Sequence, residues 1–208
     1  MAEKNKVRFG LSKLHIFFKA VDGWDEPIAV PGVTECTLNS QVKSKDFYAD
    51  NVLYFRSNAD TGDEITVTTA FFPDAVKARM LGWAIDEHGA LVRVTDGVPE
   101  EFAMAFQVEG DKKPRAKVIY SCIASVPNEN ATTKGEDIEV QTEQLNIRSK
   151  AIEVAGHKTV DAVLNESDDP DAFATFFDTV YVPSYATTAQ TTGGEGNENT
   201  EDEGNGEG

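Results

Sequence analysis

Hydrophobic and polar residues alternate most regularly in the middle of the chain, between Glu101 and Ser125. Side chains of a β-strand point alternately to its two faces, so alternating apolar residues predict a strand with one buried face. Glu101–Val108 fits this pattern, and a polar turn at residues 109–114 interrupts it before Arg115–Ser125 resumes it. The apolar residues of the first run are Phe102, Met104, Phe106 and Val108. We therefore expect a hairpin of two long strands here.

The second strand of this hairpin, Arg115–Ser125, is predicted to need cover on both faces. One face would carry Ala116, Val118, Tyr120, Cys122 and Ala124, and the other Lys117, Ile119, Ser121, Ile123 and Ser125. At ~3.3 Å per residue the strand would be roughly 36 Å long, which exceeds the usual strand length. Our hypothesis is that other copies of the same chain bury part of it.

Shorter patterns predict the elements around this hairpin. Strands are expected at Val7–Ala20, Val33–Leu38, Glu64–Phe72, Leu91–Val94 and Lys150–Ala155. A further alternating run from Ile138 to Ile147 shifts its apolar positions by one residue, which is the pattern that a β-bulge produces. A helix is expected from Asp74, as its N-cap, to Gly82, as its C-terminal stop. Helical turns are expected at His157–Leu164, and a helix after Asp169-Pro170, so that helical segments fall near residues 157–178.

Together these elements predict a mainly β fold, a β-sandwich or barrel with a flanking short α-helix. The chain has 208 residues, 40% of them hydrophobic and 26% charged, which is typical of a globular protein. We expect one domain over residues 1–185. Residues 186–208 have no apolar residue larger than alanine and are predicted to be a disordered acidic tail, because such a segment cannot offset its ordering entropy.

An aromatic excursion interrupts the strand pattern between Asn39 and Asn58. Its aromatic residues are Phe47, Tyr48, Tyr54 and Phe55. The segment could be a hairpin or a long loop. Aromatic residues are favoured in the buried centres of protein interfaces, so these four are candidate intersubunit contacts, with packing in the core of the same chain as the alternative.

The chain is strongly acidic, with a formal net charge of −17. This balance argues against tight binding to nucleic acid, because that binding depends on Lys and Arg at the phosphates. The tail carries six of the negative charges, at Glu195, Glu198, Glu201, Asp202, Glu203 and Glu207. The concentrated positive feature is Lys112, Lys113 and Arg115, predicted to be an exposed hairpin tip able to meet an acidic neighbour, with a small nucleic-acid patch as the alternative.

The sequence predicts neither a catalytic site nor a cofactor or metal site. His15, His88 and His157 have no partner at ligand spacing, and no nucleophile, phosphate-loop or dinucleotide motif is present. Acidic residues at 166–171 lack the glycine and the terminal glutamate of a calcium loop. Cys36 and Cys122 are expected to be buried free thiols, with a disulfide as the alternative. No membrane helix and no signal-type apolar run are found, so we expect a cytoplasmic protein or one released without the secretory route.

Three stretches, in this order along the chain, resemble the major tail protein family of siphophages, the phages with long non-contractile tails. They are Phe47-Tyr-Ala-Asp-Asn51 with Tyr54-Phe55, then Phe106-Gln-Val-Glu-Gly-Asp-Lys-Lys113 with Val118-Ile-Tyr120, and then Pro127 with Gln141-Thr-Glu-Gln-Leu-Asn-Ile147. The likeness extends over residues 7–152. It rests on the succession of these motifs rather than on any one of them.

This resemblance implies a tail tube protein of the virion, assembled in the host cytoplasm. Such subunits form hexameric rings that stack into the tube through which genomic DNA leaves the capsid. Strands of neighbouring subunits line the channel, while an extended loop and the terminal arms connect the rings. The implied partners are other copies of the chain, a tape-measure protein and tail-completion or initiator proteins. The implied channel does not bind DNA specifically, and negative charge on its wall would let the duplex slide.

Two other classes of function stay open at this point. The chain could be a secreted tube protein of a bacterial injection apparatus, which shares the architecture. It could also be a carbohydrate-binding or adhesion module, which would carry a row of exposed aromatic residues on one face. An enzyme is not expected, because no set of catalytic residues converges in the sequence.

Overall fold

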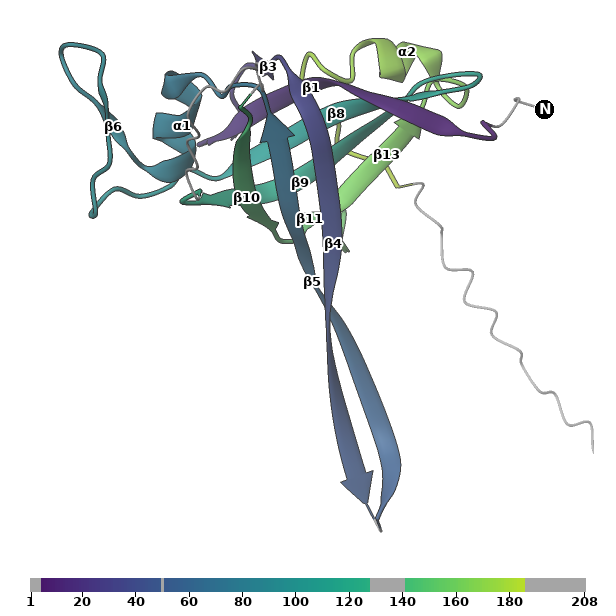
Figure 1. The fold of residues 1–208 in the computed structure, drawn as a ribbon. Coiled ribbons are helices and arrows are strands. Elements are labelled where there is room, and N and C mark those ends of the chain that lie inside the picture. Colours follow the sequence, from purple (N-terminus) through teal and green to yellow (C-terminus); the bar gives the residue numbers. More distant parts are fainter. Residues whose placement is uncertain (1–4, 50, 128–140, 186–208) are drawn as a thin grey trace, which may run out of the picture.

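The computed structural model of the chain describes residues 5–49, 51–127 and 141–185, and it is mainly β with short helices (Figure 1). The strands are β1 (Arg8–Ala20), β2 (Gly23–Trp24), β3 (Ile28–Val30), β4 (Val33–Ala49), β5 (Val52–Thr69), β6 (Ala84–Ile85), β7 (Leu91–Val92), β8 (Phe102–Gly110), β9 (Arg115–Ser125), β10 (Glu143–Ser149), β11 (Ile152–Val154), β12 (His157–Thr159) and β13 (Asp161–Asn165). The helices are α1 (Asp74–Leu81) and α2 (Pro170–Ala174). The predicted mainly β fold with short helices is confirmed.

One large antiparallel sheet organises the described residues. Its strands follow the order β2-β1-β8-β9-β10-β5-β4, with β3 also paired to β1 and β13 also paired to β9. Two small sheets, β11-β12 and β6-β7, lie outside it. The predicted hairpin of long strands is confirmed as β8 and β9, which lie in the middle of the large sheet. The predicted tail, residues 186–208, and the start of the predicted run at Ile138 lie outside the described residues.

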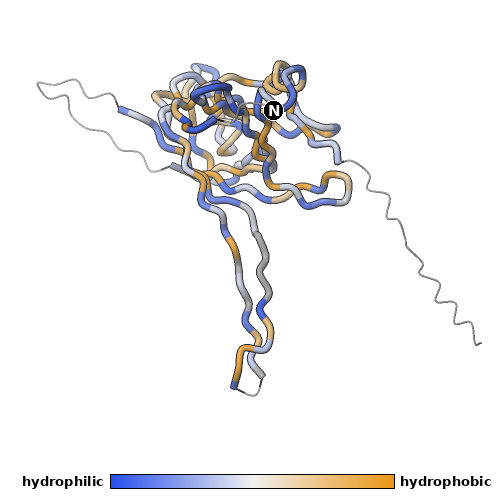
Figure 2. Tube along the Cα trace, turned by 90° about the vertical axis from the view of Figure 1, so that its right-hand side faces the viewer, coloured by the Kyte–Doolittle hydropathy of each residue, from blue (hydrophilic) through white to orange (hydrophobic). Residues whose placement is uncertain are grey.

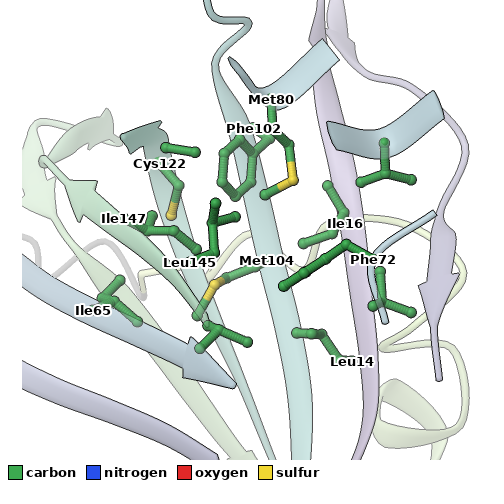
Figure 3. Packing of buried hydrophobic residues seen from close by; sticks show 14 of the residues in the cluster. Leu14, Ile16, Ile65, Phe72, Met80, Phe102, Met104, Cys122, Leu145 and Ile147 are labelled. Atoms are coloured by element: carbon green, nitrogen blue, oxygen red, sulfur yellow. The ribbon is translucent and has the colours of Figure 1, made fainter. Parts of the chain in front are cut away.

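A hydrophobic core lies on each face of this sheet. The first core packs α1 against the sheet, and Figure 3 shows Phe102 of β8 beside Met80 of the helix, with Met104 further along the strand near Leu145. The second core packs the C-terminal segment against the opposite face, where Tyr120 and Phe176 are almost completely buried. Each large side chain buried in this way contributes about 1.5–3 kcal/mol of transfer free energy. The fold is therefore a single sheet held between two layers.

Strand β9 is covered on both faces by its own chain along most of its length, and Ile123 near its end is 36% exposed. The hypothesis that other copies bury part of the strand stays a prediction. Ala116, Val118 and Tyr120 point into the second core, while Ile119 and Cys122 point into the first. The predicted assignment of faces is wrong, because β9 contains a bulge. The register shifts by one residue between the pairs Phe102↔Cys122 and Met104↔Ile119, and Ser121 has a positive φ of 46°. The inserted residue reverses which face the following side chains occupy.

Helix α1 begins one residue earlier than the sequence predicts. Asp74 is its first helical residue and Pro73 takes the N-cap position, so the expectation of an Asp74 cap is wrong. The predicted stop at Gly82 is confirmed, since this residue is left-handed (φ 68°) and its N–H donates to the carbonyl of Ala78. A Cβ at Gly82 would lie 2.6 Å from the backbone carbon of Val98, so the site also requires glycine for space.

The C-terminal third differs from the prediction in one place. Helical turns expected at His157–Leu164 are wrong, because these residues form β12 and β13. A tight turn with positive φ at Ala155 (49°) and Gly156 (81°) joins β11 to β12, as two-residue hairpin turns require. β13 then pairs with β9 from Asp161↔Ile119 to Asn165↔Arg115. Helix α2 is confirmed, with the Asp169 carboxylate accepting a 2.9 Å hydrogen bond from the Ala172 N–H.

Candidate assembly surface

The hairpin of β4 and β5 extends far beyond the rest of the molecule (Figure 1). Pairing of β5 with β10 ends at Glu64↔Arg148, whereas β4 and β5 continue to pair with each other as far as Ala49↔Val52. We call residues 40–49 and 51–63 the arm. At ~3.3 Å per residue its strands span roughly 30 Å, about the diameter of a small domain. The aromatic excursion of the sequence is therefore a hairpin, one of the two predicted alternatives.

The base of the arm is fixed to the body by close backbone contact. Gly62 has φ 102°, and a Cβ there would lie 2.0 Å from the carbonyl oxygen of Ser149. Next to it, the N–H of the buried Asp63 donates to Ser149 Oγ at 3.0 Å, and Ser40 Oγ donates to Asp63 Oδ1 at 2.8 Å. A register shift between Ser40 and Val42 places a bulge at the same level. Bulges bend a hairpin, so these contacts set the direction of the arm.

The end of the arm carries large apolar side chains that touch little of the chain. The arm tip, as we define it, is Phe47, Tyr48, Val52, Leu53, Tyr54 and Phe55, and these residues are between 45% and 75% exposed. Figure 2 shows hydrophobic residues returning at the end of the arm after a more polar shaft. Apolar patches of several hundred Å² are rare on monomeric proteins and mark interaction sites.

Both faces of the arm tip are apolar. Cross-strand partners share a face, so Phe47 and Phe55 lie on one side while Tyr48 and Leu53 lie on the other. Tyr54 is the extra residue at the register shift between these two pairs, and its ring meets that of Phe47 edge-on at 6.4 Å. Neither face of the tip packs against the body. A partner that covers one face would therefore leave the other face in water.

A charged pair separates the tip from the shaft of the arm. The Arg56 guanidinium donates to the Asp46 carboxylate through Nε at 2.7 Å and through an Nη at 2.9 Å. This contact lowers the pKa of Asp46 and raises that of Arg56. Because the pair is exposed to solvent, it contributes little to the stability of the fold. Its bidentate geometry instead holds the two strands in register next to the tip.

The structure brings together some of the predicted site residues and separates others. Phe47, Tyr48, Tyr54 and Phe55 gather at the arm tip. Lys112 and Lys113 lie on the turn between β8 and β9, and Arg115 begins β9, away from the arm. There Lys113 Nζ contacts Glu166 at 2.5 Å, and the half-buried Arg115 has no hydrogen-bond partner for its Nε. The prediction that this basic cluster meets an acidic neighbour stays untested by these contacts.

Sequence analysis missed Val52 and Leu53, which complete the tip. A signal was present, because Val52–Phe55 is an unbroken apolar run directly after Asn51, which takes a positive φ of 63° at the turn. An apolar run next to a turn residue, with no alternation, is typical of a hairpin end that is apolar on both faces. Since strands buried on one face alternate, the absence of alternation was the useful observation.

Other chemistry is not evident in the described residues. No group of three or more His, Cys, Asp or Glu side chains in this part of the chain could hold a metal ion, and none of the described helices is long and apolar enough to cross a membrane. Cys36 and Cys122 are free; Cys122 is buried, as predicted, whereas Cys36 is only partly buried. Burial raises the pKa of Cys36 to about 11 and also raises that of Cys122, so both are poor nucleophiles at neutral pH.

Comparisons with known proteins give likeness to solved structures but no match of sequence. No family model matches the sequence, and the search of curated proteins found no match. The fold is similar to a solved structure described as "Cryo-EM structure of the anti-feeding prophage cap (AFP tube terminating cap)", with 11% sequence identity and a TM-score of 0.43. The match covers 79% of this chain and 97% of that one.

Proposed function

We propose that this chain is a structural subunit of a phage tail, which assembles into stacked hexameric rings and so builds the tube through which DNA is delivered. The observation that carries the proposal is the arm, with its two-sided apolar tip. The role of the chain in the virion is inferred from the resemblance of the sequence to siphophage major tail proteins. The subunit is made and assembled in the host cytoplasm.

Exposure of the apolar arm tip to water costs free energy, and burial in an assembly would recover it. Aromatic side chains bury about 150–250 Å² each, so the four aromatic residues of the tip, roughly two thirds exposed, offer about 500 Å². At about 25 cal/mol per Å² this area is worth up to roughly 12 kcal/mol on burial, before the cost of association is subtracted. An isolated two-stranded ribbon is marginally stable in water, so a partner surface also supports the ribbon itself.

The length of the arm favours contact between layers of subunits. Its reach of roughly 30 Å equals the diameter of a small domain, so the tip can leave its own subunit and contact the next layer. An extended loop that connects rings is also part of what the sequence resemblance implies for the family. The proposal therefore assigns the arm to contacts between rings, where it contacts another copy of the chain.

The acidity of the chain fits a conduit. With a net charge of −17, the protein presents a potential that repels DNA phosphates if acidic residues face the channel. A wall of this kind lets the duplex pass without adsorbing, since adsorption requires Lys and Arg at the phosphates. Tape-measure and initiator proteins complete the proposed set of partners, and they would set where the tube starts and how long it grows.

Electron microscopy of the purified chain tests this function. The wild type is expected to form rings or tubes with a central hole as the concentration rises. A shortened variant, in which Asn-Gly replaces residues 44–58, keeps the pair Lys43↔Ala59 and gives it a two-residue turn. This variant should fold normally and form no tubes. A wild type that stays monomeric at every concentration, with an arm already protected from hydrogen exchange, would contradict the proposal.

A further inference from the structure

A second protrusion, the finger, projects from the end of α1. We define it as residues 83–98, which include β6 and β7 (Figure 1). Its base is tightly held, because a Cβ at Gly97 would lie 1.7 Å from the carbonyl oxygen of Gly82. Its turn is also fixed, with Asp86 Oδ1 accepting hydrogen bonds from the N–H groups of His88 (2.9 Å) and Ala90 (2.7 Å). The finger is thus held in one shape before any partner binds.

The finger displays apolar and acidic residues together. Ile85 is 45% exposed, Val92 41% and Val98 81%. Its charged residues are Asp86, Glu87, Asp96 and Arg93, three acidic and one basic. In the described part of the chain β6 pairs only with β7 and the two do not join the large sheet. A rigid two-stranded element with exposed branched side chains is a surface suited to docking.

A surface of opposite charge lies where the N-terminal residues run beside the β8–β9 turn. We call residues 5–9 and 111–115 the basic flank. The Asn5 side chain holds the two segments together, donating to the Lys113 carbonyl at 2.6 Å and accepting from the Lys112 N–H at 3.1 Å. The Lys6 N–H donates to Asp111 Oδ1 at 2.8 Å. The backbone of the flank is therefore as well fixed as that of the finger.

The basic flank displays apolar and basic residues together. Val7 is 57% exposed and Phe9 58%. Its charged residues are Lys6, Arg8, Lys112, Lys113, Arg115 and Asp111, five basic and one acidic, in a chain whose net charge is −17. Lys113 forms an ion pair with Glu166. Burial lowers the pKa of the Arg115 guanidinium and the nearby charge of Arg8 lowers it further, while Asp161 and Asp168 act in the opposite direction. The flank thus retains positive charge that an acidic partner would stabilise.

We propose that the finger of one copy docks on the basic flank of a neighbouring copy. This inference rests on the proposed function, since it names the contact that joins copies side by side. Ile85 and Val92 would cover Val7 and Phe9, with the acidic side chains of the finger beside Lys6 and Arg8. The finger and the N-terminal end of β1 lie on opposite sides of the molecule in Figure 1. A contact between two different surfaces repeats from copy to copy and closes into a ring if the rotation allows it.

A second copy suits the basic flank better than nucleic acid does. Phosphates would pair with the charges but would leave Val7 and Phe9 in water. The finger offers acidic side chains for the basic residues and apolar side chains for Val7 and Phe9, on one rigid element. Electrostatic complementarity of this kind fixes the register of a contact and excludes wrong partners more than it adds affinity.

Charge reversal tests the contact in the full-length chain. The finger variant carries Glu87→Lys and Asp96→Lys, and it spares Asp86, whose carboxylate holds the turn. The flank variant carries Lys6→Glu and Arg8→Glu. In sedimentation experiments each variant alone should self-associate on the order of tenfold more weakly than wild type, because like charges then meet. An equimolar mixture of the two should recover association, since each reversed surface finds a complementary one.

Matched controls are available in the β11–β12 hairpin. Glu153→Lys and Lys158→Glu change charge by the same amount per residue at exposed positions away from both surfaces. These controls should associate like the wild type, and all variants should unfold at the same temperature. Association of either surface variant at wild-type strength, or a mixture that fails to recover, would overturn the proposal. So would a flank variant that loses only its binding to duplex DNA.

Crosslinking separates this proposal from the proposed function. Carbodiimide treatment of mixed light and heavy isotope-labelled chains should join Lys6 of one copy to Glu87 of another, and mass spectrometry would identify the mixed-label peptide. Rings in the microscope without this crosslink would overturn the finger contact and leave the tube function standing. The crosslink in small oligomers that never form rings or tubes would do the reverse. Chains that never associate would contradict both.

Discussion

The substitution Phe55→Ser separates assembly from folding, because Phe55 belongs to the arm tip and is 60% exposed. A phenylalanine side chain buries about 200 Å² when fully covered, so roughly 120 Å² of this ring remains to be buried by a partner. At about 25 cal/mol per Å² that area is worth about 3 kcal/mol per contact, or about 150-fold in the dissociation constant. The free energy of unfolding of the monomer should change by less than about 0.5 kcal/mol, as for other surface substitutions.

A matched control is provided by Phe71, a phenylalanine of the body that is 54% exposed. Phe71→Ser removes a similar apolar area, but from a residue that the proposed tube contact does not use. Lys77 Nζ lies 5.0 Å from the centre of the Phe71 ring, so the control loses one weak cation–π contact. We therefore expect the control to assemble like the wild type, apart from a small change in stability.

Two measurements on the same samples check this prediction. Urea denaturation at low concentration gives the free energy of unfolding of the monomer, and light scattering over a concentration series gives the threshold for assembly. The threshold should rise strongly for Phe55→Ser and stay unchanged for Phe71→Ser. If both variants shift the threshold equally, the arm tip is not the specific contact. If Phe55→Ser lowers monomer stability by more than about 1 kcal/mol, the tip already packs within its own chain.

Four further predictions concern the fold and its titrating groups. Gly62→Ala should lower the free energy of unfolding, measured in urea, by about 3 kcal/mol, because the added Cβ would overlap the Ser149 carbonyl and the residue has φ 102°. An unchanged urea midpoint would contradict the close contact between the base of the arm and the body. Tyr120→Phe should lower the melting temperature by about 3 °C, because it removes a 2.6 Å hydrogen bond worth about 1 kcal/mol. The Cys36 thiol, with a pKa of about 11, should react with iodoacetamide at pH 8 far more slowly in the native than in the urea-unfolded chain. The hydrogen bond from Arg56 lowers the pKa of Asp46 from 3.8, so the ion pair supports the arm above pH 3.8 and is lost as the pH falls through the lowered pKa of the folded chain. An NMR titration of the Asp46 carboxyl should give a midpoint below 3.8, and a midpoint at or above 3.8 would contradict this prediction.

Local patterns predicted the central elements because local physics decides them. Alternation along Glu101–Val108 and Arg115–Ser125 gave β8 and β9, and Gly82 ended α1 as a left-handed glycine should. The failures concern tertiary contacts. The helical turns expected at His157–Leu164 became strands, because pairing with β9 satisfies the backbone of Asp161–Asn165 better than an isolated helical turn would.

The candidate site was predicted in part, for similar reasons. The composition of the Asn39–Asn58 excursion pointed to the four aromatic residues, since aromatics among charged residues need cover. The finger was not predicted as an interaction surface, because β6 and β7 have two residues each and their placement depends on the contact between Gly82 and Gly97. The bulge at Ser121 could not be predicted from the sequence either, because apolar residues occur on both faces of β9.

The position of the unburied apolar surface constrains how assembly can proceed. Sequence analysis expected the long central strand to need other copies, yet β9 is buried on both faces along most of its length by α1 and by the C-terminal segment of its own chain. Assembly therefore need not complete the core of the subunit. Many of the exposed large apolar side chains lie instead on the arm tip, the finger and the basic flank, each anchored at its base, while others such as Phe71 lie singly on the body. A subunit built in this way can fold first and assemble later, so substitutions on these protrusions should change assembly and leave folding intact.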